Sequence, residues 1–495
     1  MNKTQKTLLT FFAAALVVGW TCFDERLSRL GDNAEFVVLS KGLVTGHWMS
    51  FVHGPEPEPA RKFPPGYPIV LAAVQLVSPD NVSLMKSLNV LFFALVVPLA
   101  WLVVREVDTE LTATLVAATT LLSPHLIEFS HQVLSEVPYA ALSLAALLFL
   151  LKYRHSDIPK EWIVLVVLAV SSYYIRTIGL TAIGMVVCTQ FLDGRYRQGF
   201  LMGVAAAILI APWVLSSSAY LDQFSSVNPY QTDSSPGVSI GFLFERLGRN
   251  LSKYGLVFLP TAFAPFLDFR QGVEGMGVAL AVAIDLLFFY FIVMTIRHGK
   301  KEAPIGVYLA LYVFVVLLWP EVWADTRFVI PIIPLAIYGI FWSVRDITAR
   351  LPLNDTLKTR IPMGLAIAVL LANGLRTANT QIDHPPYHPV WRDYFEAAKW
   401  AKTATPPDAI ILCRKPFLMN VMSGRTTVSY PWAVPDSVLS VIKAKSVDYV
   451  VYDQLFSSTP RYLLPTIRQH GSHFKGLHQY PQSKTTVFQF VAKPE

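Results

Sequence analysis

The chain has 495 residues, of which 53% are hydrophobic and 15% are charged, and its mean hydropathy is +0.44. Because soluble proteins usually carry about 25% charged residues, this composition excludes a soluble enzyme, a disordered chain and a small disulfide scaffold. The net charge of +7 could suggest a nucleic-acid partner, but the Lys and Arg residues fall between apolar segments, as they do in cytoplasmic loops. We therefore expect an integral membrane protein with no nucleic-acid partner.

Apolar segments recur along most of the chain. A helix that crosses a bilayer needs about 20 apolar residues, with about 17 as the lower limit. The sequence predicts a mainly α, polytopic membrane protein with about eleven spans, several of them short by this count. The predicted spans are 7–23, 83–104, 109–124, 134–152, 160–175, 176–192, 198–218, 276–296, 303–320, 327–345 and 361–376.

The basic residues predict the orientation of these spans. Lys3 and Lys6 precede the first span, which has no A-x-A cleavage site behind it and is expected to be a retained anchor. Placing the basic loops inside puts the N-terminus in the cytoplasm and the C-terminus outside. Those loops hold Lys152, Arg154, Lys160, Arg195, Arg197, Arg297, Lys300, Lys301, Arg345, Arg350, Lys358 and Arg360.

One apolar stretch, 66–79, is too short for a span and is predicted to be an interfacial helix on the outer face. Three regions then face outward: the loop 24–82, the loop 219–275, and the tail 377–495. We predict two domains, a transmembrane domain over 1–376 and a small extracytoplasmic α/β domain over 377–495. The tail has strand-like and helix-like runs at Ala409–Cys413, Val447–Tyr452, Thr485–Val491, Trp391–Lys402, Asp436–Lys445 and Pro460–His470.

Polar residues gather at the predicted outer ends of the spans, where each one has a structural and a functional interpretation. Asp32 follows a glycine and could simply cap a helix, and Asp24-Glu25 is a rival acidic site. Lys62 precedes a rigid Pro-Pro-Gly turn and either anchors the chain at the membrane surface or binds a phosphate.

Further polar residues lie at other helix ends. Glu136 begins the fourth span, and the nearby His125, Glu128 and His131 form a hydrated turn as readily as a metal-ligand set. Arg176 and Arg327 could extend to lipid headgroups or grip a phosphate, which guanidinium matches in geometry. Asp285 lies inside the eighth span and either has a function or pairs with a neighbouring helix.

An outer face with carboxylates, a Lys and two Arg suits the transfer of a group from a phosphate. The sequence has no G-x-x-x-x-G-K-[ST] or G-x-G-x-x-G motif for a nucleotide. An outward-facing transferase would lack nucleotide sugars, so its donor is expected to be carried by a lipid.

The ordered motifs resemble those of GT-C glycosyltransferases, and in particular the bacterial relatives of protein O-mannosyltransferases and the lipid A aminoarabinose transferase. The resemblance covers about residues 1–376 and rests on these motifs: Gly-Asp32-Asn-Ala-Glu-Phe, Lys62-Phe-Pro-Pro-Gly-Tyr, Ser-Glu136-x-Pro-Tyr, Arg176-x-x-Gly-Leu and Arg327-x-x-x-Pro-x-x-Pro. It implies a multi-pass protein of the bacterial inner membrane that takes a sugar from a polyprenyl-phosphate donor.

The resemblance also implies roles for single residues. Asp32 matches a catalytic Asp, Glu136 a second acidic catalytic position, and Lys62 a donor-phosphate Lys. Arg176 and Arg327 are expected to bind the same phosphate. The residues expected to bind substrate are Asn33, Glu35, Tyr67 and Tyr139.

Two departures from the family pattern bear on metal dependence. Many relatives have Asp-Glu where this chain has Asp32-Asn33, and some have an acid where this chain has Arg61. We expect no required cofactor, with a divalent metal possible. We expect an inverting transfer to an acceptor hydroxyl with Asp32 as general base, the acceptor being a protein, a lipid or a glycan.

Two other classes of function stay open. A flippase or transporter would place its polar residues near the midplane in paired broken helices, where only Asp285 is clearly deep. A membrane-anchored envelope assembly protein would act through the C-terminal domain, and would leave Asp32 and Lys62 as capping and anchoring residues.

Overall fold

The computed structural model describes residues 1–217, 240–265, 275–299 and 301–491, and its residues fall into two compact units. The first, which we call the helical unit, contains Met1–Glu25, Arg61–Tyr67 and Lys86–Asp383. The second, which we call the mixed unit, contains Arg26–Ala60, Pro68–Met85 and His384–Glu495. The mixed unit thus joins most of the predicted first outer loop to the C-terminal residues, whereas the sequence suggested a single division between 376 and 377.

The helical unit consists of α-helices joined by short turns and single turns of 3-10 or π-helix. Its helices are α1 (Lys3–Thr21), α4 (Val82–Val107, most of it), α5 (Glu110–Leu121), α6 (Pro124–Ser130), α7 (Glu136–Tyr153), α8 (Pro159–Ile175), α9 (Leu180–Leu192), α10 (Tyr196–Ser216), α12 (Ile240–Lys253), α13 (Leu259–Phe263), α14 (Met276–Arg297), α15 (Ala303–Leu318), α16 (Ile333–Arg350) and α17 (Asp355–Gln381). Its short turns are η1 (Thr177–Gly179), η2 (Tyr254–Phe258), η4 (Glu321–Trp323), η5 (Thr326–Phe328) and η6 (Ile330–Ile332).

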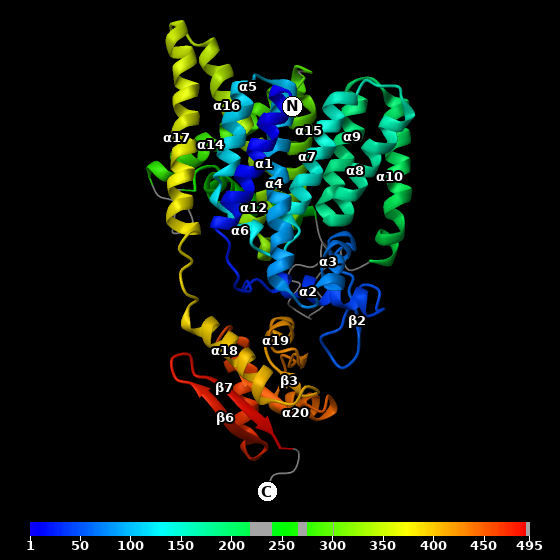
Figure 1. Cartoon of the computed structure of the whole chain (residues 1–495), viewed down its shortest axis with the longest axis vertical. Helices are drawn as coiled ribbons and strands as arrows, with labels where there is room; N and C mark the ends of the chain where they lie inside the picture. The colour runs from blue at the N-terminus through cyan, green and yellow to red at the C-terminus, as the bar shows by residue number, and fades with distance from the viewer. Residues whose placement is uncertain (218–239, 266–274, 300, 492–495) are drawn as a thin grey trace. The chain divides into compact units, whose positions relative to one another are not determined.

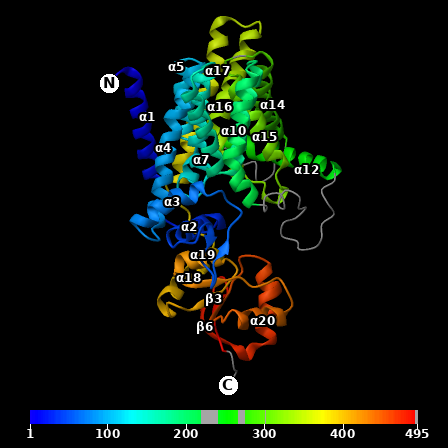
Figure 2. The same cartoon turned by 90° about the vertical axis from the view of Figure 1, so that its right-hand side faces the viewer.

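Consecutive helices of this unit pack side by side. Figure 1 shows α7, α8, α9 and α10 as neighbours, and Figure 2 shows α14, α15 and α16 in the same way. Helix α7 illustrates why these segments are helical, because it is rich in Leu and Ala and carries Glu136 in its first turn and Lys152 in its last, where each charge complements the helix dipole.

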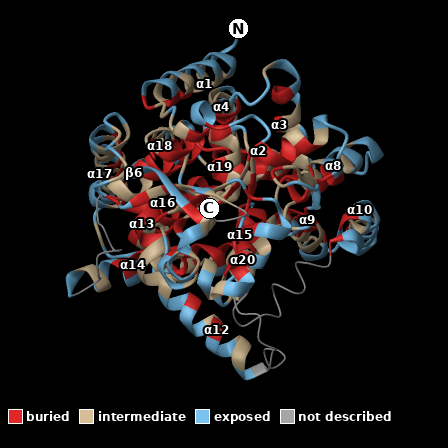
Figure 3. Cartoon of the chain, turned by 90° about the horizontal axis from the view of Figure 1, so that it is seen from below, coloured by how far each residue is buried: buried red, intermediate tan, exposed pale blue. Residues whose placement is uncertain are grey.

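Six helices in the described part of the chain are long and apolar enough to cross a membrane. They are Val82–Val107, Glu136–Tyr153, Tyr196–Ser216, Met276–Arg297, Thr326–Arg350 and Asp355–Gln381. All eleven segments predicted from the sequence overlap helices, and the predicted interfacial segment forms α3 (Gly66–Val77). Eleven crossings remain a prediction, because the other helices are shorter or less apolar. In Figure 3, few residues of α10 and α17 are buried, as expected of apolar helices that face lipid.

An ion pair joins the end of α4 to α16, with the Asp108 side chain 4% exposed and that of Arg345 40% exposed. Arg345 donates from Nη1 and Nη2 to the two carboxylate oxygens of Asp108, at 2.8 and 2.6 Å. Tyr338, about two turns earlier on α16, donates a hydrogen bond to the same carboxylate at 3.3 Å. Such bidentate pairs are directional as well as strong, so this contact fixes the register of the two helices.

Two glycines from separate motifs hold the end of α8. A Cβ atom at Gly66 would lie 2.6 Å from the carbonyl oxygen of Tyr174, and one at Gly179 would overlap the peptide between Ser172 and Tyr173. Only glycine fits both positions, because the backbones approach too closely for a side chain. The two contacts fix the backbone that leads into Arg176.

The mixed unit contains a five-stranded sheet with helices on both faces. Its elements are α2 (Gly31–Val44), β1 (Ser50–Phe51), β2 (Glu58–Pro59), α3 from Pro68 onward, α18 (Pro389–Ala404), β3 (Ile410–Leu412), α19 (Pro416–Ser423), β4 (Thr426–Val428), α20 (Pro435–Ala444), β5 (Tyr449–Tyr452), η7 (Thr459–Leu463), α21 (Leu464–Gln469), η8 (Gly471–His473), β6 (Phe474–Tyr480) and β7 (Thr485–Phe490). The strand order is β4-β3-β5-β7-β6, with β4, β3 and β5 parallel and the other pairs antiparallel.

Two hydrophobic cores cover the faces of this sheet. One core joins alternate strand residues such as Ile411 and Val451 to α18 and α19, and the other joins Leu412 and Val450 to α20 and η7. The alternation along each strand places successive side chains in opposite cores. The three predicted strand runs and three predicted helix runs of the tail are present, whereas β4, β6 and α19 were not predicted.

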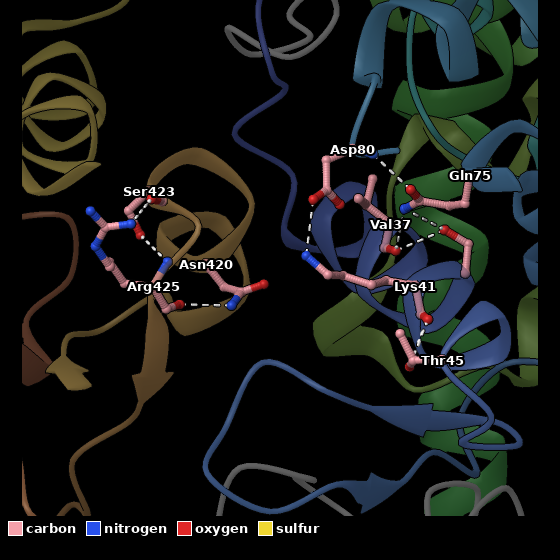
Figure 4. Close-up of polar contacts among 9 residues, drawn as sticks. Val37, Lys41, Thr45, Gln75, Asp80, Asn420, Ser423 and Arg425 are labelled. Carbon is pink, nitrogen blue, oxygen red and sulfur yellow. Dashed lines mark hydrogen bonds and ion pairs between the residues drawn. The ribbon is translucent and has the colours of Figure 1, made fainter. Parts of the chain in front are cut away.

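Helix α2 is held by polar contacts as well as by packing against α19. Figure 4 shows Lys41 Nζ paired with Asp80 at 2.9 Å. Gln75 Nε2 donates to Ser40 Oγ at 3.3 Å. The amide of Asp80 donates to Gln75 Oε1 at 2.7 Å, so one network joins α2 to α3 and the turn that follows it. Figure 4 also shows how Asn420 on α19 donates to the carbonyl of Arg425.

Replacing Gly179 by alanine should lower the stability of the helical unit by about 1–3 kcal/mol, because the new methyl group would overlap the α8 backbone. Gly203→Ala on α10 is the matched control, since its Cβ would meet Val187 at 3.5 Å, an ordinary contact. Thermal unfolding in detergent measures both variants. Equal unfolding temperatures would contradict the close approach at Gly179.

Candidate active site

A buried carboxylate joins two of the predicted phosphate-binding arginines. Glu136 is fully buried, and its Oε1 lies 2.7 Å from Arg176 Nη1 and 2.9 Å from Arg327 Nε. The side chains of Arg176 and Arg327 are 12% and 16% exposed. The structure therefore brings these three predicted site residues into one cluster. We call Arg176 and Arg327 the arginine pair.

Local backbone structure positions each member of this cluster. Glu136 is the first residue of α7, Arg176 leaves α8 in an extended conformation, and Arg327 lies in η5. The carboxylate of Asp325 caps η5 by accepting a hydrogen bond from the Arg327 amide at 3.0 Å. Both guanidinium groups also lie against the ring of Phe328, at 5.4 and 5.5 Å from its centre.

One carboxylate oxygen of this cluster makes no hydrogen bond to the described residues. Glu136 Oε2 is buried and has no hydrogen-bond partner among the described residues, although leaving such an oxygen unpaired is costly. Arg176 Nη1 also donates to Ser135 Oγ at 3.1 Å. Two largely buried guanidinium groups thus meet at one carboxylate, and their geometry suits a further anion such as a phosphate.

An apolar cavity lies next to this cluster in the helical unit. Phe328 and Tyr312 line it, and the Tyr312 hydroxyl donates to the Phe328 carbonyl at 2.9 Å. Asp285 and Tyr254 line it as well, and each has a buried oxygen without a hydrogen-bond partner in the part of the chain that the structure describes. The side chain of Asp285 fits there because position 255 is glycine.

Lys62 lies in the same unit, on the segment that precedes α3. Its ammonium group is 4.6 Å from the ring centre of Phe63, and the side chain is half-buried. The Pro-Pro-Gly turn after Lys62 ends at Gly66, whose close contact with Tyr174 ties this segment to the backbone before Arg176. The predicted rigid turn is therefore present and packs against the end of α8.

Two predicted substrate-binding tyrosines are fully buried and hydrogen-bonded. Tyr67 donates to Asn89 Oδ1 at 3.0 Å. The Tyr139 hydroxyl lies 2.9 Å from the Tyr308 hydroxyl and 3.2 Å from Thr181 Oγ1. Both side chains therefore join helices of the unit together.

The mixed unit carries the other predicted residues at the start of α2. The N-cap of α2 is Leu30, so the interpretation of Asp32 as the capping residue is wrong, and Asp32 instead lies in the first turn. Asn33 is fully buried and donates to the Leu30 carbonyl at 3.3 Å, while Asp32 and Glu35 are half-buried.

Sequence reasoning missed a lysine beside this helix end. Lys415 Nζ lies 3.4 Å from the position that a Cβ atom would take at Gly31, the residue before Asp32. A helix N-terminus and an ammonium group both stabilise negative charge at this place. Nothing local in the sequence links Lys415 to Gly31, because the contact depends on the packing of α19 against α2.

The sequence did not decide whether the protein binds a metal ion. Within the described ranges, no three or more His, Cys, Asp or Glu side chains gather closely enough to hold a metal ion. His131, one of the nearby candidates, has its Nε2 3.0 Å from the carbonyl of Gly19, which joins α1 to the segment before α7.

Replacing Glu136 by glutamine should destabilise the helical unit by about 3–5 kcal/mol, because two buried guanidinium groups would lose their counter-charge. The control is Glu110→Gln, whose exposed pair with Lys3 should contribute less than about 1 kcal/mol. Combining Glu136→Gln with Arg327→Gln should recover part of the loss. Thermal unfolding in detergent measures the stability of each variant. Equally small effects of Glu136→Gln and Glu110→Gln would contradict the role of Glu136.

Part of the chain, with two residues of this cluster, is similar to a known protein family. Residues 59–226 match the family model described as dolichyl-phosphate-mannose-protein mannosyltransferase. This range includes Lys62, Glu136 and Arg176. No curated protein matches the chain.

Two solved structures share the fold of the chain at low sequence identity. ArnT from Cupriavidus metallidurans, bound to undecaprenyl phosphate, is 14% identical with a TM-score of 0.60, and the match covers 99% of each chain. The Archaeoglobus fulgidus oligosaccharyltransferase, tethered to an acceptor peptide with an NVT sequon, is 11% identical with a TM-score of 0.58, covering 98% of this chain and 74% of that one. The same oligosaccharyltransferase has been solved with Zn and sulfate, and that structure also has a TM-score of 0.58. The family match and the shared fold together confirm the resemblance of this chain to GT-C membrane glycosyltransferases, and with it the predicted enzyme class.

Proposed function

We propose that the protein transfers a sugar from a polyprenyl-phosphate donor to an acceptor hydroxyl at the extracytoplasmic face of the membrane. The observation that carries this proposal is the convergence of Arg176 and Arg327 on the buried carboxylate of Glu136. The matching family is described by a dolichyl-phosphate donor, and ArnT was solved with undecaprenyl phosphate, so both relatives point to the same class of carrier.

The arginine pair and Lys62 are proposed to bind the donor phosphate. Guanidinium matches phosphate geometry and stays charged at any physiological pH. The apolar cavity beside Phe328 is the kind of surface that an isoprenoid chain requires. Phosphate is already a good leaving group, so the cations are expected to stabilise its developing charge rather than to protonate it.

Asp32 is proposed to be the general base. The acceptor hydroxyl oxygen attacks the anomeric carbon, its proton passes to the Asp32 carboxylate, and the bond between that carbon and the phosphate oxygen breaks. Polyprenyl phosphate leaves with the bonding electron pair. A single displacement of this kind inverts the configuration of the sugar.

The other predicted site residues are assigned by their environment. Glu136 was expected to be catalytic, and its two ion pairs favour a positioning role toward the arginines. Glu35 is proposed to contact substrate. Asn33, Tyr67 and Tyr139 are proposed to hold the surrounding backbone in place, since each is fully buried and hydrogen-bonded.

The membrane arrangement stays as the sequence predicts it. We propose eleven spans in a bacterial inner membrane, a cytoplasmic N-terminus, an interfacial α3, and an extracytoplasmic α/β domain over 377–495. The outer loop 219–275 lies in part outside the described residues. The acceptor is proposed to be a protein, a lipid or a glycan, and a divalent metal is compatible with the oligosaccharyltransferase that was solved with Zn.

One observation favours a lipid-linked-sugar flippase as the second candidate. Asp285 lies inside α14, lines the apolar cavity and has a buried oxygen without a partner in the described ranges. A flippase would move the donor lipid across the membrane without breaking its sugar–phosphate bond. Release of free polyprenyl phosphate from the donor therefore discriminates the two functions.

Replacing Asp32 by asparagine should abolish transfer in membranes that are supplied with donor lipid, because the amide cannot accept the hydroxyl proton. Radiolabelled sugar in the acceptor fraction measures the rate. Glu56→Gln, an exposed change in the same outer loop, should leave the rate unchanged. Near-normal transfer by Asp32→Asn, or loss of transfer in Glu25→Gln instead, would assign the base elsewhere.

Replacing Arg176 by glutamine should lower kcat/KM for the donor lipid by about 10²-fold, because a cation that faces the leaving phosphate is removed. Arg350→Gln is the control, since that exposed arginine pairs with Asp346 four residues earlier on the same helix. Donor consumption at several lipid concentrations separates the two variants. Equal values of kcat/KM would remove Arg176 from the phosphate site.

A further inference from the structure

Three parallel strands of the mixed unit end at one edge of its sheet. Strands β4, β3 and β5 are adjacent and parallel, so the chain leaves all three on the same side. Arg414 follows β3, Trp432 follows β4, and Asp453 follows β5. In open α/β sheets, ligands bind outside the carboxyl ends of parallel strands.

The connections at this edge diverge. After β3 the chain enters α19, which belongs to the core on one face of the sheet. After β4 and β5 the chain enters α20 and η7, which belong to the core on the other face. Neighbouring strands whose connections turn to opposite faces define a topological switch point, and in this sheet β3 differs in this way from both of its neighbours, β4 and β5.

Cationic and aromatic side chains meet at this switch point. The guanidinium of Arg414 lies 5.4 Å from the ring centre of Trp432 and 5.0 Å from that of Phe456. Trp432 is 46% exposed and Phe456 is 38% exposed, so part of each ring is accessible to a ligand. The rings of Trp432 and Tyr462 are parallel to within 1°, with centres 6.4 Å apart.

A buried acid at the same edge has an unused oxygen. Asp453 is fully buried, and its Oδ1 accepts hydrogen bonds from the Leu455 amide at 3.0 Å and Thr459 Oγ1 at 3.1 Å. Its Oδ2 is buried without a hydrogen-bond partner among the residues that the structure describes. Burial raises the pKa of this carboxyl to about 6. An oxygen in that position is suited to a ligand hydroxyl.

We propose that the carboxyl edge of β4, β3 and β5 binds a saccharide that bears an anionic group, a phosphate or a carboxylate. The exposed rings of Trp432 and Phe456 offer flat apolar surfaces to the C–H faces of a sugar ring. Arg414 pairs with the anion, because its fork of donors matches carboxylate and phosphate oxygens. Asp453 Oδ2 accepts a hydrogen bond from a sugar hydroxyl. The ammonium group of Lys415, which lies beside Gly31, is 4.9 Å from the ring centre of Phe456, so this binding site adjoins the start of α2, where Asp32 lies.

The proposal is tested by direct binding to the whole protein in phosphatidylcholine nanodiscs, so the outcome does not depend on transfer. The probes are glucose 6-phosphate, glucose and inorganic phosphate, and saturation-transfer NMR measures their affinities. Glucose 6-phosphate should bind about tenfold more tightly than either of the others, because it engages the rings and Arg414 together.

Two variants locate the binding. Arg414→Gln should reduce the affinity for glucose 6-phosphate to that for glucose, and Trp432→Leu should reduce it at least about fivefold. The controls are Arg468→Gln and Trp48→Leu, which are exposed residues of the same unit away from this edge. Because Trp432 is exposed, its replacement should leave the fold intact even if the Arg414 variant were unstable.

Three outcomes would overturn the proposal. The first is no binding of glucose 6-phosphate, and the second is binding that neither variant weakens. The third is binding of glucose 6-phosphate no tighter than that of phosphate, with loss of both in nanodiscs that contain phosphatidylglycerol, which would assign the edge to a lipid headgroup. Tight binding that both variants weaken, in either nanodisc, supports a saccharide site.

Discussion

The buried carboxylate of Glu136 is the interaction on which the candidate site depends. Taking charges out of water is costly, and a buried pair is tolerated only when its geometry and hydrogen bonds compensate. Here one carboxylate accepts from two guanidinium groups that come from the end of α8 and from η5. Both guanidinium groups are held in place without any bound ligand, so the site is preorganised for an anion and needs little rearrangement when the anion arrives.

Packing around this cluster explains features that the motifs alone leave unexplained. Gly66 and Gly179 are both required by close approaches to the last turn of α8, so the glycines of two separate motifs serve the placement of one arginine. The bidentate pair of Asp108 and Arg345 links α4 to α16, the helix that follows η5 and η6. The charged residues of the Glu136 cluster thus contact one another, as do Asp108 and Arg345. Their positions follow from helix packing.

Hydropathy predicted helices at all eleven apolar segments, because long apolar runs have few alternatives to a helix in a bilayer. Glu136, Arg176 and Arg327 could be identified singly, but not their contact, since residues so far apart in the chain are brought together only by packing. Strand β4 was missed because only one of its three residues is apolar, whereas the equally short β3 is Ile-Ile-Leu. Strand β6 was missed because its side chains are mostly exposed and show no apolar alternation. Lys415 was missed for a related reason: only the contact of α19 with α2 brings it near Gly31.

The mixed unit is assembled from segments near both ends of the sequence, and this has a consequence for biosynthesis. Helix α2 ends at Val44, whereas its packing partner α19 begins at Pro416. At roughly 5–20 residues per second, a ribosome needs on the order of half a minute to make the intervening chain. Throughout that interval the apolar side of α2 lacks its partner, and the intervening spans must enter the bilayer first. A chaperone or a transient partner helix would have to shield α2 until translation reaches α19.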